Sequence, residues 1–184
     1  MQKQRTYLML LGVCAAVFAL CPFARAEESI EAKVKAAFLA NFTQFVEWPE
    51  RAFASPDAPL VVGVLGASPF GDNLDRAMAG RSAGKRRIEV KRFKTAAEAA
   101  GAHILYISNS ERERLPKILE ELNGKPILTV GDSENFIPLG GIIRFVLRDE
   151  RVQLDVNPEP AQRNEVRISA KLLRLSNIIT VRKR

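Results

Sequence analysis

The chain is poor in the residues from which catalytic and metal sites are most often built. Its 184 residues include two cysteines and one histidine. Both cysteines, Cys14 and Cys21, fall within the first 26 residues. Residues 27–184 therefore offer no thiol for a disulfide, a nucleophile or a metal ion. A zinc site needs three or four nitrogen or sulfur ligands, and this composition does not supply them.

The sequence also lacks the signatures of common enzyme classes. It has no Gly-x-Ser-x-Gly elbow, and the spacings Gly63–Gly66 and Gly66–Gly71 match neither a dinucleotide nor a phosphate-loop pattern. His103 opens an apolar run, where a structural histidine is more common than a catalytic one. The neighbouring acids Glu120 and Glu121 are typical of a solvated helix face. We therefore predict that the protein is not an enzyme and holds no cofactor and no metal.

The positive charge is modest and does not indicate a nucleic-acid partner. The formal net charge is +7, and removing the three basic residues of the first 26 lowers it to +4. The densest basic cluster is Lys85–Arg87, with Lys91 and Arg92 close behind. A nucleic-acid surface would interleave such residues with aromatic side chains. The cluster is better explained as a solvated loop and strand edge.

The first 26 residues have the layout of a secretory signal peptide. Lys3 and Arg5 are followed by the apolar run Leu8–Phe23 and by Ala24-Arg-Ala26, which has small residues where a signal peptidase reads. We expect cleavage after Ala26 and an exported single domain of residues 27–184. An uncleaved anchor is the alternative, since the run nearly reaches membrane-spanning length. A lipid anchor at Cys21 is disfavoured by the bulky Leu20.

Apolar runs and turn residues predict an α/β fold. Strands are expected at 60–65, 88–93, 103–108 and 127–130, and helices at 29–46, 68–78, 95–101 and 110–122. A hairpin of runs 142–147 and 152–156 and a helix at 170–181 follow. This order predicts three layers: a mainly parallel sheet with an antiparallel hairpin at one edge and helices on both faces.

Two details of this pattern can be tested directly. The first helix spaces its large apolar residues as one face, which is expected to be buried: Ile30, Val34, Phe38, Phe42 and Phe45. Pro116 is awkward inside the helix expected at 110–122, so it marks either a kink or the true start of that helix.

Two loops are candidates for binding a ligand. Ser68 follows the first strand and Asp132 follows the fourth. Ligands of open parallel sheets bind at the carboxyl ends of strands. Ser68 with free helix amides could hold an anion, and Asp132 could accept a hydrogen bond from a donor. Ordinary capping and turn chemistry is the simpler explanation of both residues, and a ligand pocket is the alternative.

Six blocks of sequence, taken in order, resemble the YfiR family of periplasmic proteins. They are Lys33–Pro49, Val62–Gly71, His103–Ser108, Pro126–Asp132, Gly140–Phe145 and Ile168–Leu175. The resemblance implies a periplasmic regulator rather than an enzyme. It implies binding to the periplasmic sensor part of an inner-membrane diguanylate cyclase, whose repression lowers cyclic-di-GMP and biofilm formation. An outer-membrane release partner and a homodimer are implied as well.

One departure from the family matters. Its best-known members carry disulfides in the exported domain, and this chain has no cysteine after residue 26. Apolar packing must then supply the ~2–4 kcal/mol that a disulfide typically adds. If the leader is cleaved, redox control through the protein's own thiols is excluded.

The candidate partner contacts come from the hairpin and the last helix. They are Arg144, Phe145, Asn157, Ile168 and Lys171, chosen because interfaces favour aromatic side chains and Arg. Phe145 and Ile168 are equally well explained as core residues. The alternative function is a periplasmic small-molecule sensor that acts on another membrane receptor or kinase through Ser68 and Asp132. An exported hydrolase is the weakest hypothesis, since no paired carboxylates are visible.

Overall fold

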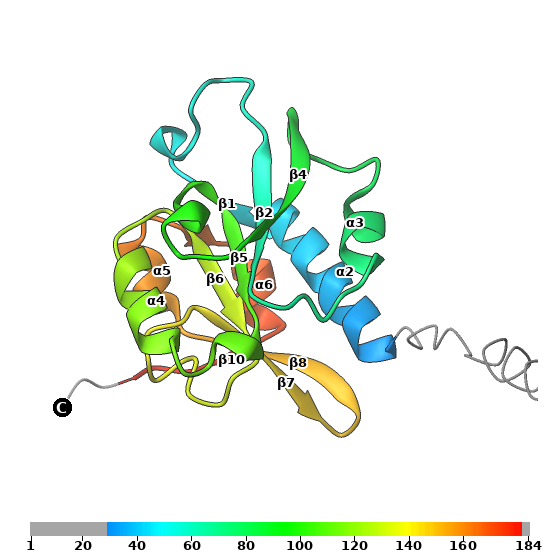
Figure 1. The fold of residues 1–184 in the computed structure, drawn as a ribbon, viewed down its shortest axis with the longest axis vertical. Helices are drawn as coiled ribbons and strands as arrows, with labels where there is room; N and C mark the ends of the chain where they lie inside the picture. Colours follow the sequence, from blue (N-terminus) through cyan, green and yellow to red (C-terminus); the bar gives the residue numbers. More distant parts are fainter. Residues whose placement is uncertain (1–28, 182–184) are drawn as a thin grey trace, which may run out of the picture.

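The computed structural model describes residues 29–181, and the predicted signal peptide lies outside them. An eight-stranded sheet forms the centre, in the order β10-β8-β7-β6-β5-β2-β4-β3 (Figure 1). The strands are β2 (Leu60–Leu65), β3 (Ser82–Ala83), β4 (Arg86–Phe93), β5 (Ile104–Ile107), β6 (Leu128–Gly131), β7 (Ile143–Arg148), β8 (Arg151–Val156) and β10 (Asn177–Ile178). A separate two-stranded sheet joins β1 (Val46–Glu47) to β9 (Arg167–Ile168).

The strand directions confirm the predicted sheet. The strands β4, β2, β5, β6 and β7 pair in parallel, and β8 returns antiparallel to β7. The β7–β8 hairpin turns at Asp149 and Glu150, whose φ values of 49° and 58° are typical of a two-residue hairpin loop. The short strand β10 then extends the sheet beyond the hairpin, parallel to β8.

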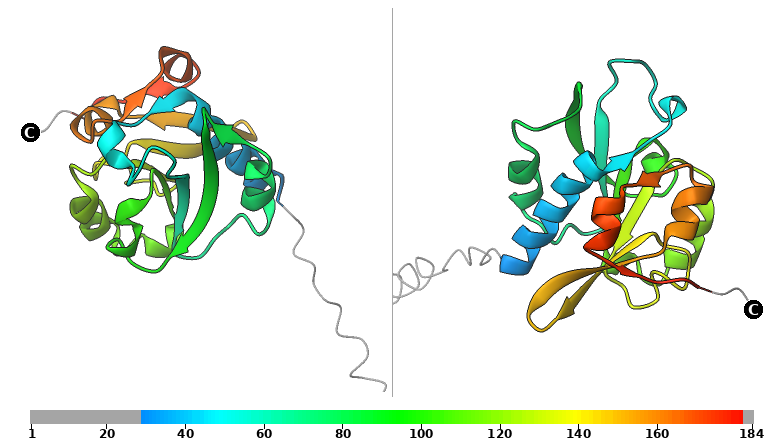
Figure 2. Two further views of the ribbon diagram at one scale, coloured as in Figure 1. Left: turned by 90° about the horizontal axis from the view of Figure 1, so that it is seen from above. Right: turned by 180° about the vertical axis from the view of Figure 1, so that it is seen from behind.

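Helices cover both faces of the sheet, which confirms the three-layer architecture. The α-helices are α2 (Ile30–Phe45), α3 (Asn73–Met78), α4 (Leu115–Leu122), α5 (Pro158–Arg163) and α6 (Ala170–Arg174). Short 3-10 helices are η2 (Glu50–Ala52), η3 (Glu98–Gly101) and η4 (Asn109–Glu111). Side chains of α2, α3 and α6 pack into one core cluster, and those of α4 and η3 pack into another. Figure 2 shows α2 and α6 on the face turned away from the viewer in Figure 1.

The buried face of α2 is not the one that its large apolar residues predict. Ile30 is 80% exposed and Val34 is 37% exposed, so the predicted face was wrong at this end of the helix. The buried residues are instead Ala32, Lys35, Ala36, Leu39, Ala40, Phe42 and Thr43. Small alanine side chains let a helix lie close to its neighbours, and the dispersion contacts of this close packing favour burial of the alanine face. This rotation carries one charged residue, Lys35, into the interior.

Two helices begin later than expected. The α3 helix begins at Asn73 and not at Ser68, and α4 begins at Leu115, with Pro116 in its first turn. Proline has no backbone N–H, and it fits the first turn because an N–H group there would have no partner within the helix. Pro116 thus marks the true start of α4. Ser108 caps the preceding turn η4.

The C-terminal region is more broken than the sequence suggested. The helix expected at 170–181 stops at Arg174, and Asn177–Ile178 forms strand β10. The β-branched residues after Ser176 favour this extended structure over helix. The helix α5 was not predicted, although Asn157 followed by Pro158 is a recognisable helix start, with the Asn157 side chain accepting from the Glu159 amide at 3.2 Å.

Candidate functional site

Two neighbouring cavities lie at the carboxyl ends of the central strands. The first, here called the α2 cavity, has a volume of ≈ 310 Å³ and is bordered by α2, β7 and the loop after β6. The second, the α4 cavity, has a volume of ≈ 740 Å³ and lies between the start of α4 and the same loop. Asn109, Asp132 and Glu134 line both. This is the edge at which open parallel sheets bind ligands.

Asp132 is the centre of a polar cluster beside the α2 cavity. Its Oδ2 atom accepts from the Lys35 ammonium at 3.0 Å and from the Tyr106 hydroxyl at 2.8 Å. Lys35 also pairs with Glu31 at 2.6 Å and lies 5.8 Å from the centre of the Phe145 ring. Three elements therefore meet here: α2 supplies the cation, β5 the hydroxyl and the end of β6 the carboxylate.

The protonation states of this cluster follow from its surroundings. Burial is the largest influence on the pKa of Lys35 and lowers it, but hydrogen bonds and charges from Glu31 and Asp132 outweigh burial, so the pKa lies above its usual value. Burial, reinforced by Asp132, also raises the pKa of Tyr106. Lys35 therefore stays charged and Tyr106 stays protonated at neutral pH, so both act as hydrogen-bond donors.

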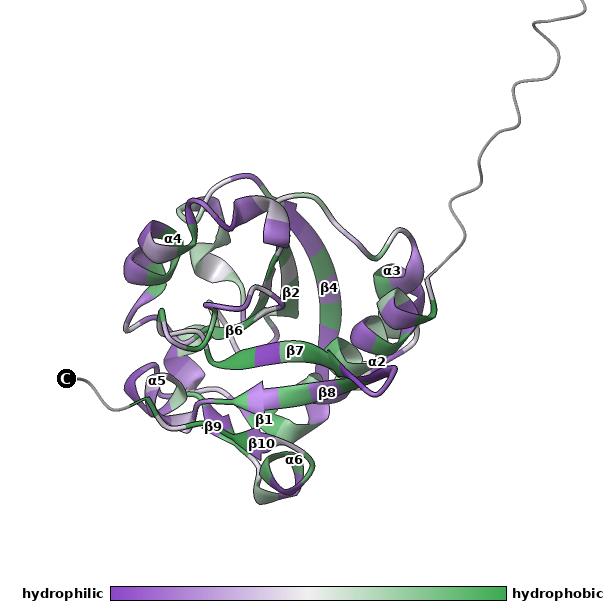
Figure 3. Cartoon of the chain, turned by 90° about the horizontal axis from the view of Figure 1, so that it is seen from below, coloured by the Kyte–Doolittle hydropathy of each residue, from purple (hydrophilic) through white to green (hydrophobic). Residues whose placement is uncertain are grey.

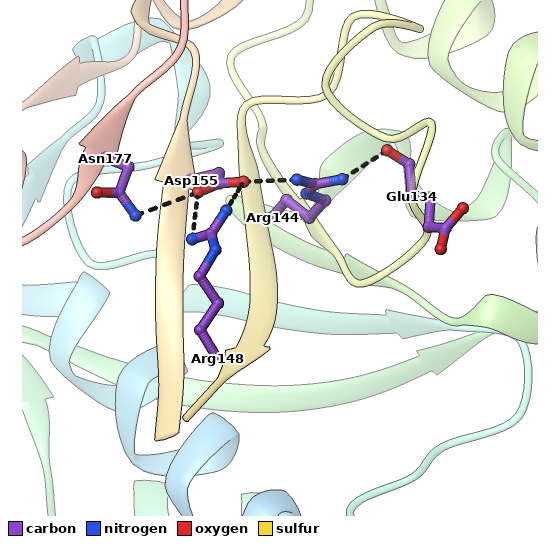
Figure 4. A network of polar contacts seen from close by, with 5 residues as sticks. All are labelled: Glu134, Arg144, Arg148, Asp155 and Asn177. Carbon is purple, nitrogen blue, oxygen red and sulfur yellow. Dashed lines mark hydrogen bonds and ion pairs between the residues drawn. The ribbon is translucent and has the colours of Figure 1, made fainter. Parts of the chain in front are cut away.

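A second polar network surrounds Asp155 on the hairpin (Figure 4). Asp155 accepts from Arg144 at 2.6 Å and from Arg148 at 2.9 and 3.0 Å. Asn177 of β10 donates to it at 3.4 Å, and Arg144 also donates to the Glu134 carbonyl at 2.7 Å. Burial alone would raise the pKa of Asp155, but the bonds from Arg148 and Arg144 hold it below its usual value. This carboxylate thus fastens β10 and the β6–β7 loop to the hairpin.

The loop between β6 and β7 is fixed by close packing around Phe136. The Phe136 ring is fully buried against Gly131 and Gly141. A Cβ atom at Gly131 would lie 2.5 Å from the ring, so only glycine fits there. This packing sets the positions of Asp132 and Glu134, the loop residues that line both cavities.

The two predicted ligand residues are not brought together. Ser68 is exposed in the loop before α3, and its hydroxyl accepts from the Phe70 amide at 3.3 Å. Because α3 begins only at Asn73, Ser68 does not sit at a helix N-terminus as expected. Ser68 is also absent from the linings of both cavities. Asp132 alone lies in a cavity.

The predicted partner contacts differ widely in exposure. Phe145 is 2% exposed and Asn157 is 3% exposed. Arg144 is engaged by Asp155 and Glu134. Lys171 is exposed on α6, and Ile168 is half-buried on the adjoining strand β9. Direct contact with a partner stays a prediction, and Lys171 and Ile168 are the best placed to make it.

Exposed apolar side chains continue from that region onto β10. Leu175 is 71% exposed, Ile178 is 55% exposed and Ile179 is 37% exposed. Figure 3 shows α6 and β10 together at one edge of the molecule, next to β8. We call the residues Ile168, Lys171, Leu175, Ile178 and Ile179 the α6–β10 surface.

His103 is a structural residue. Its Nδ1 atom accepts from the Val61 amide at 3.0 Å, and Nε2 lies 3.2 Å from the Ala52 carbonyl. Its ring stacks on Phe53 at 4.3 Å, and the Trp48 indole donates to the His103 carbonyl at 3.0 Å. Burial lowers the pKa of His103 to about 4, so the ring is neutral, and since Nδ1 accepts a hydrogen bond, the proton is assigned to Nε2. Trp48 and His103 thus anchor the amino end of the sheet.

Sequence reasoning missed Lys35, Tyr106 and Asp155. Each is a polar group within an apolar segment, and each is held by partners more than 20 residues away or on another strand. One signal was available. Asp155 lies between the apolar residues Leu154 and Val156 near the end of a strand, and a charge that is buried at such a position requires partners.

Residues 29–181 contain neither a cluster suited to a metal ion nor a helix suited to a membrane. No group of three or more His, Cys, Asp or Glu side chains in this range could hold a metal ion. No helix within the same range is long and apolar enough to cross a membrane.

Comparison with known families identifies the chain. The family model described as YfiR/HmsC-like matches residues 32–177. The chain belongs to the YfiR/HmsC-like family. Membership implies a periplasmic regulatory domain, not a catalytic one, in diguanylate cyclase signalling. No curated protein matches the chain.

The fold is shared with solved structures, among them the ABC domain from Streptococcus pneumonia in complex with L-Trp, with 10% sequence identity and a TM-score of 0.51. The match covers 79% of this chain and 60% of that one, so this chain spans less than two thirds of its length. At this identity the likeness concerns the fold alone.

Proposed function

We propose that this YfiR/HmsC-like protein represses an inner-membrane diguanylate cyclase by binding the periplasmic sensor part of that enzyme. Repression lowers cyclic-di-GMP and with it biofilm formation. The observation that carries the proposal is the family match over residues 32–177. The polar clusters support it, because both are ion-paired and serve to fix loops and strands rather than to activate a nucleophile.

The α6–β10 surface is the proposed contact with the cyclase. Exposed apolar patches rimmed by polar residues mark interaction sites in soluble proteins. Leu175 and Ile178 are the most exposed large apolar residues of this patch, and Lys171 adds a cation beside Phe45, 5.1 Å from the ring centre. Phe145 and Asn157 would act from beneath, by holding the hairpin and the start of α5 in place.

Two further partners belong to the proposal through the family alone: an outer-membrane protein that relieves repression, and a second copy of the chain. Neither follows from a contact seen in the structure. We propose cleavage of the leader after Ala26 on the sequence pattern alone, which places the domain free in the periplasm.

A deletion and complementation experiment tests the function. Loss of the gene should raise cellular cyclic-di-GMP, and the wild-type gene should restore it. The Leu175→Asp variant should fail to restore it while folding normally, because Leu175 is 71% exposed. The matched control is Leu139→Asp, since Leu139 is 39% exposed on the loop before β7. No rise on deletion would refute the function. Full complementation by Leu175→Asp would refute only the surface.

The second candidate is a small-molecule sensor acting on another receptor or kinase. The observation that favours it is the α2 cavity, where Lys35, Asp132 and Arg144 converge at the ligand-binding edge of the sheet. A normal cyclic-di-GMP level in the deletion strain, together with ligand binding by the purified protein, would favour this function over the first.

A further inference from the structure

Two buried side-chain atoms have no hydrogen-bond partner within residues 29–181: Asp132 Oδ1 and Arg144 Nε. Both residues line the α2 cavity. One atom is an acceptor and the other is a donor. A buried polar atom without a partner has lost the hydrogen bonds it would make to water, so such atoms are rare and point to a missing binding partner.

The ion-paired groups around these atoms balance in charge, and the remaining carboxylate of the lining, Glu134, is exposed to solvent. Lys35 is paired with both Glu31 and Asp132, which leaves one excess negative charge. Arg144 and Arg148 are both paired with Asp155, which leaves one excess positive charge. A ligand with a net charge would leave one charge uncompensated in a partly buried site, which is costly.

One side of the α2 cavity is apolar, and the cavity is small. Phe145, Val146 and Leu147 line one side, and the volume of ≈ 310 Å³ is at the lower limit for ligand pockets. Both orphan atoms are buried, so we expect a ligand to reach them only when exposed side chains of the lining, such as Leu147 and Glu31, turn outward. These side chains border the cavity and are 57% and 41% exposed.

We propose that the α2 cavity binds a small neutral carboxamide. Its N–H donates to Asp132 Oδ1, its carbonyl oxygen accepts from Arg144 Nε, and its hydrocarbon part lies against Val146 and Leu147. A primary amide carries a donor and an acceptor on the same carbon without net charge. The inference goes beyond the proposed function, because it concerns the isolated domain and holds whatever the membrane partner is.

A matched ligand series tests it. Isobutyramide, isobutyrate and isobutylamine share a branched carbon skeleton and differ in the polar group. Valine adds a zwitterion. Each is titrated at up to about 50 mM into the ¹⁵N-labelled domain, and amide shifts are followed by NMR. We expect saturable shifts at residues of the cavity with isobutyramide. Isobutyrate and isobutylamine should bind at least about tenfold more weakly, because each satisfies only one of the two atoms.

Two variants locate the site. Arg144→Lys keeps the charge that faces Asp155 but removes the Nε–H, and it should weaken isobutyramide binding about tenfold. Leu147→Gln changes only the exposed apolar wall and should weaken it as well. The matched control is Arg163→Lys, because Arg163 is exposed and pairs with Glu159 on α5. This control should bind isobutyramide as the wild type does.

Several results would overturn the inference. Equal binding of all four compounds, or tightest binding of valine or isobutyrate, would exclude the amide. No shift with any compound would leave a bridging water as the partner of the two atoms. Unchanged affinity in both cavity variants would place the amide elsewhere. None of these outcomes bears on the cyclase hypothesis, because the assay contains no partner protein.

Discussion

Asp155→Asn should be one of the most damaging isosteric changes in the chain. The Asp155 side chain is 1% exposed and receives hydrogen bonds from Arg144, Arg148 and Asn177. Asparagine keeps the shape but removes the charge that balances two guanidinium groups. Breaking a buried ion pair by neutralising one partner destabilises a protein by about 3–5 kcal/mol. Arg148 is 39% exposed and can turn to solvent, so we expect a loss near the lower end, about 3 kcal/mol.

Urea denaturation measures this loss. With a slope of about 1–3 kcal/mol/M, a loss of about 3 kcal/mol should lower the midpoint by about 1–3 M. The matched control is Asp75→Asn, since Asp75 is 55% exposed and pairs with Arg92. An exposed pair contributes only about 0–1 kcal/mol. Equal losses in the two variants would refute the claim that the Asp155 network holds the hairpin and β10 together.

The pH dependence gives a second check on the same residue. The pKa of Asp155 is lower in the folded protein than in the unfolded chain. Its contribution is therefore fully present above the unfolded carboxyl pKa of about 3.9 and is lost as the pH falls through the folded pKa. The difference between wild type and Asp155→Asn should shrink across that acid range. A difference that stays constant down to the lowest pH would show that it is not due to the carboxylate charge.

Three other predictions concern His103, Gly131 and the leader. The one histidine, His103, should show a pKa near 4 in an NMR titration. Its neutral ring therefore stabilises the folded protein fully above pH 6.5, and this contribution is lost as the pH falls toward 4. A measured pKa near 6.5 would contradict the burial of the ring. Gly131→Ala should lower stability by about 1–3 kcal/mol through contact with Phe136, whereas Gly101→Ala, which meets nothing within 4 Å, should not. Mass spectrometry of the exported protein should show a chain that begins at Glu27 and does not react with thiol reagents. A chain that such a reagent labels would still contain Cys14 and Cys21, so its leader would not have been cleaved.

The central strands could be predicted because their sequences are continuous apolar runs. Strands β2, β5 and β6 are buried at every residue, and parallel strands covered on both faces require such runs. The hairpin was recognisable as well, since two β-rich runs flank a short charged turn. A local sequence pattern is therefore enough to predict these strands and the hairpin.

The face of α2 could not be predicted from its large side chains. Ile30 and Val34 suggested one face, but the close approach allowed by Ala32, Ala36 and Ala40 decided the other. Such tertiary packing is not encoded in the spacing of a single helix. The same rotation buries Lys35. For this reason the sequence predicted Asp132 but not the polar cluster around it. Asp132 could be found from its place after a strand, whereas its partners come from α2 and β5.

The C-terminal region shows a different limit. Leu172, Leu173 and Leu175 are good helix formers, and the helix starts as expected at Ala170. It ends early because Asn177 and Ile178 pair with β8 and because Asn177 reaches Asp155. That partner lies 22 residues earlier in the chain, so no local propensity could reveal it.

The central claim is that this protein binds and inhibits a membrane diguanylate cyclase. The most direct measurement is affinity capture from solubilised inner membranes with the tagged domain, followed by an assay of the eluate for conversion of GTP to cyclic-di-GMP. The account predicts that wild type and Leu139→Asp recover this activity, that Leu175→Asp recovers much less, and that added free domain inhibits the recovered enzyme. An eluate without cyclase activity, or a cyclase that the domain does not inhibit, would contradict it.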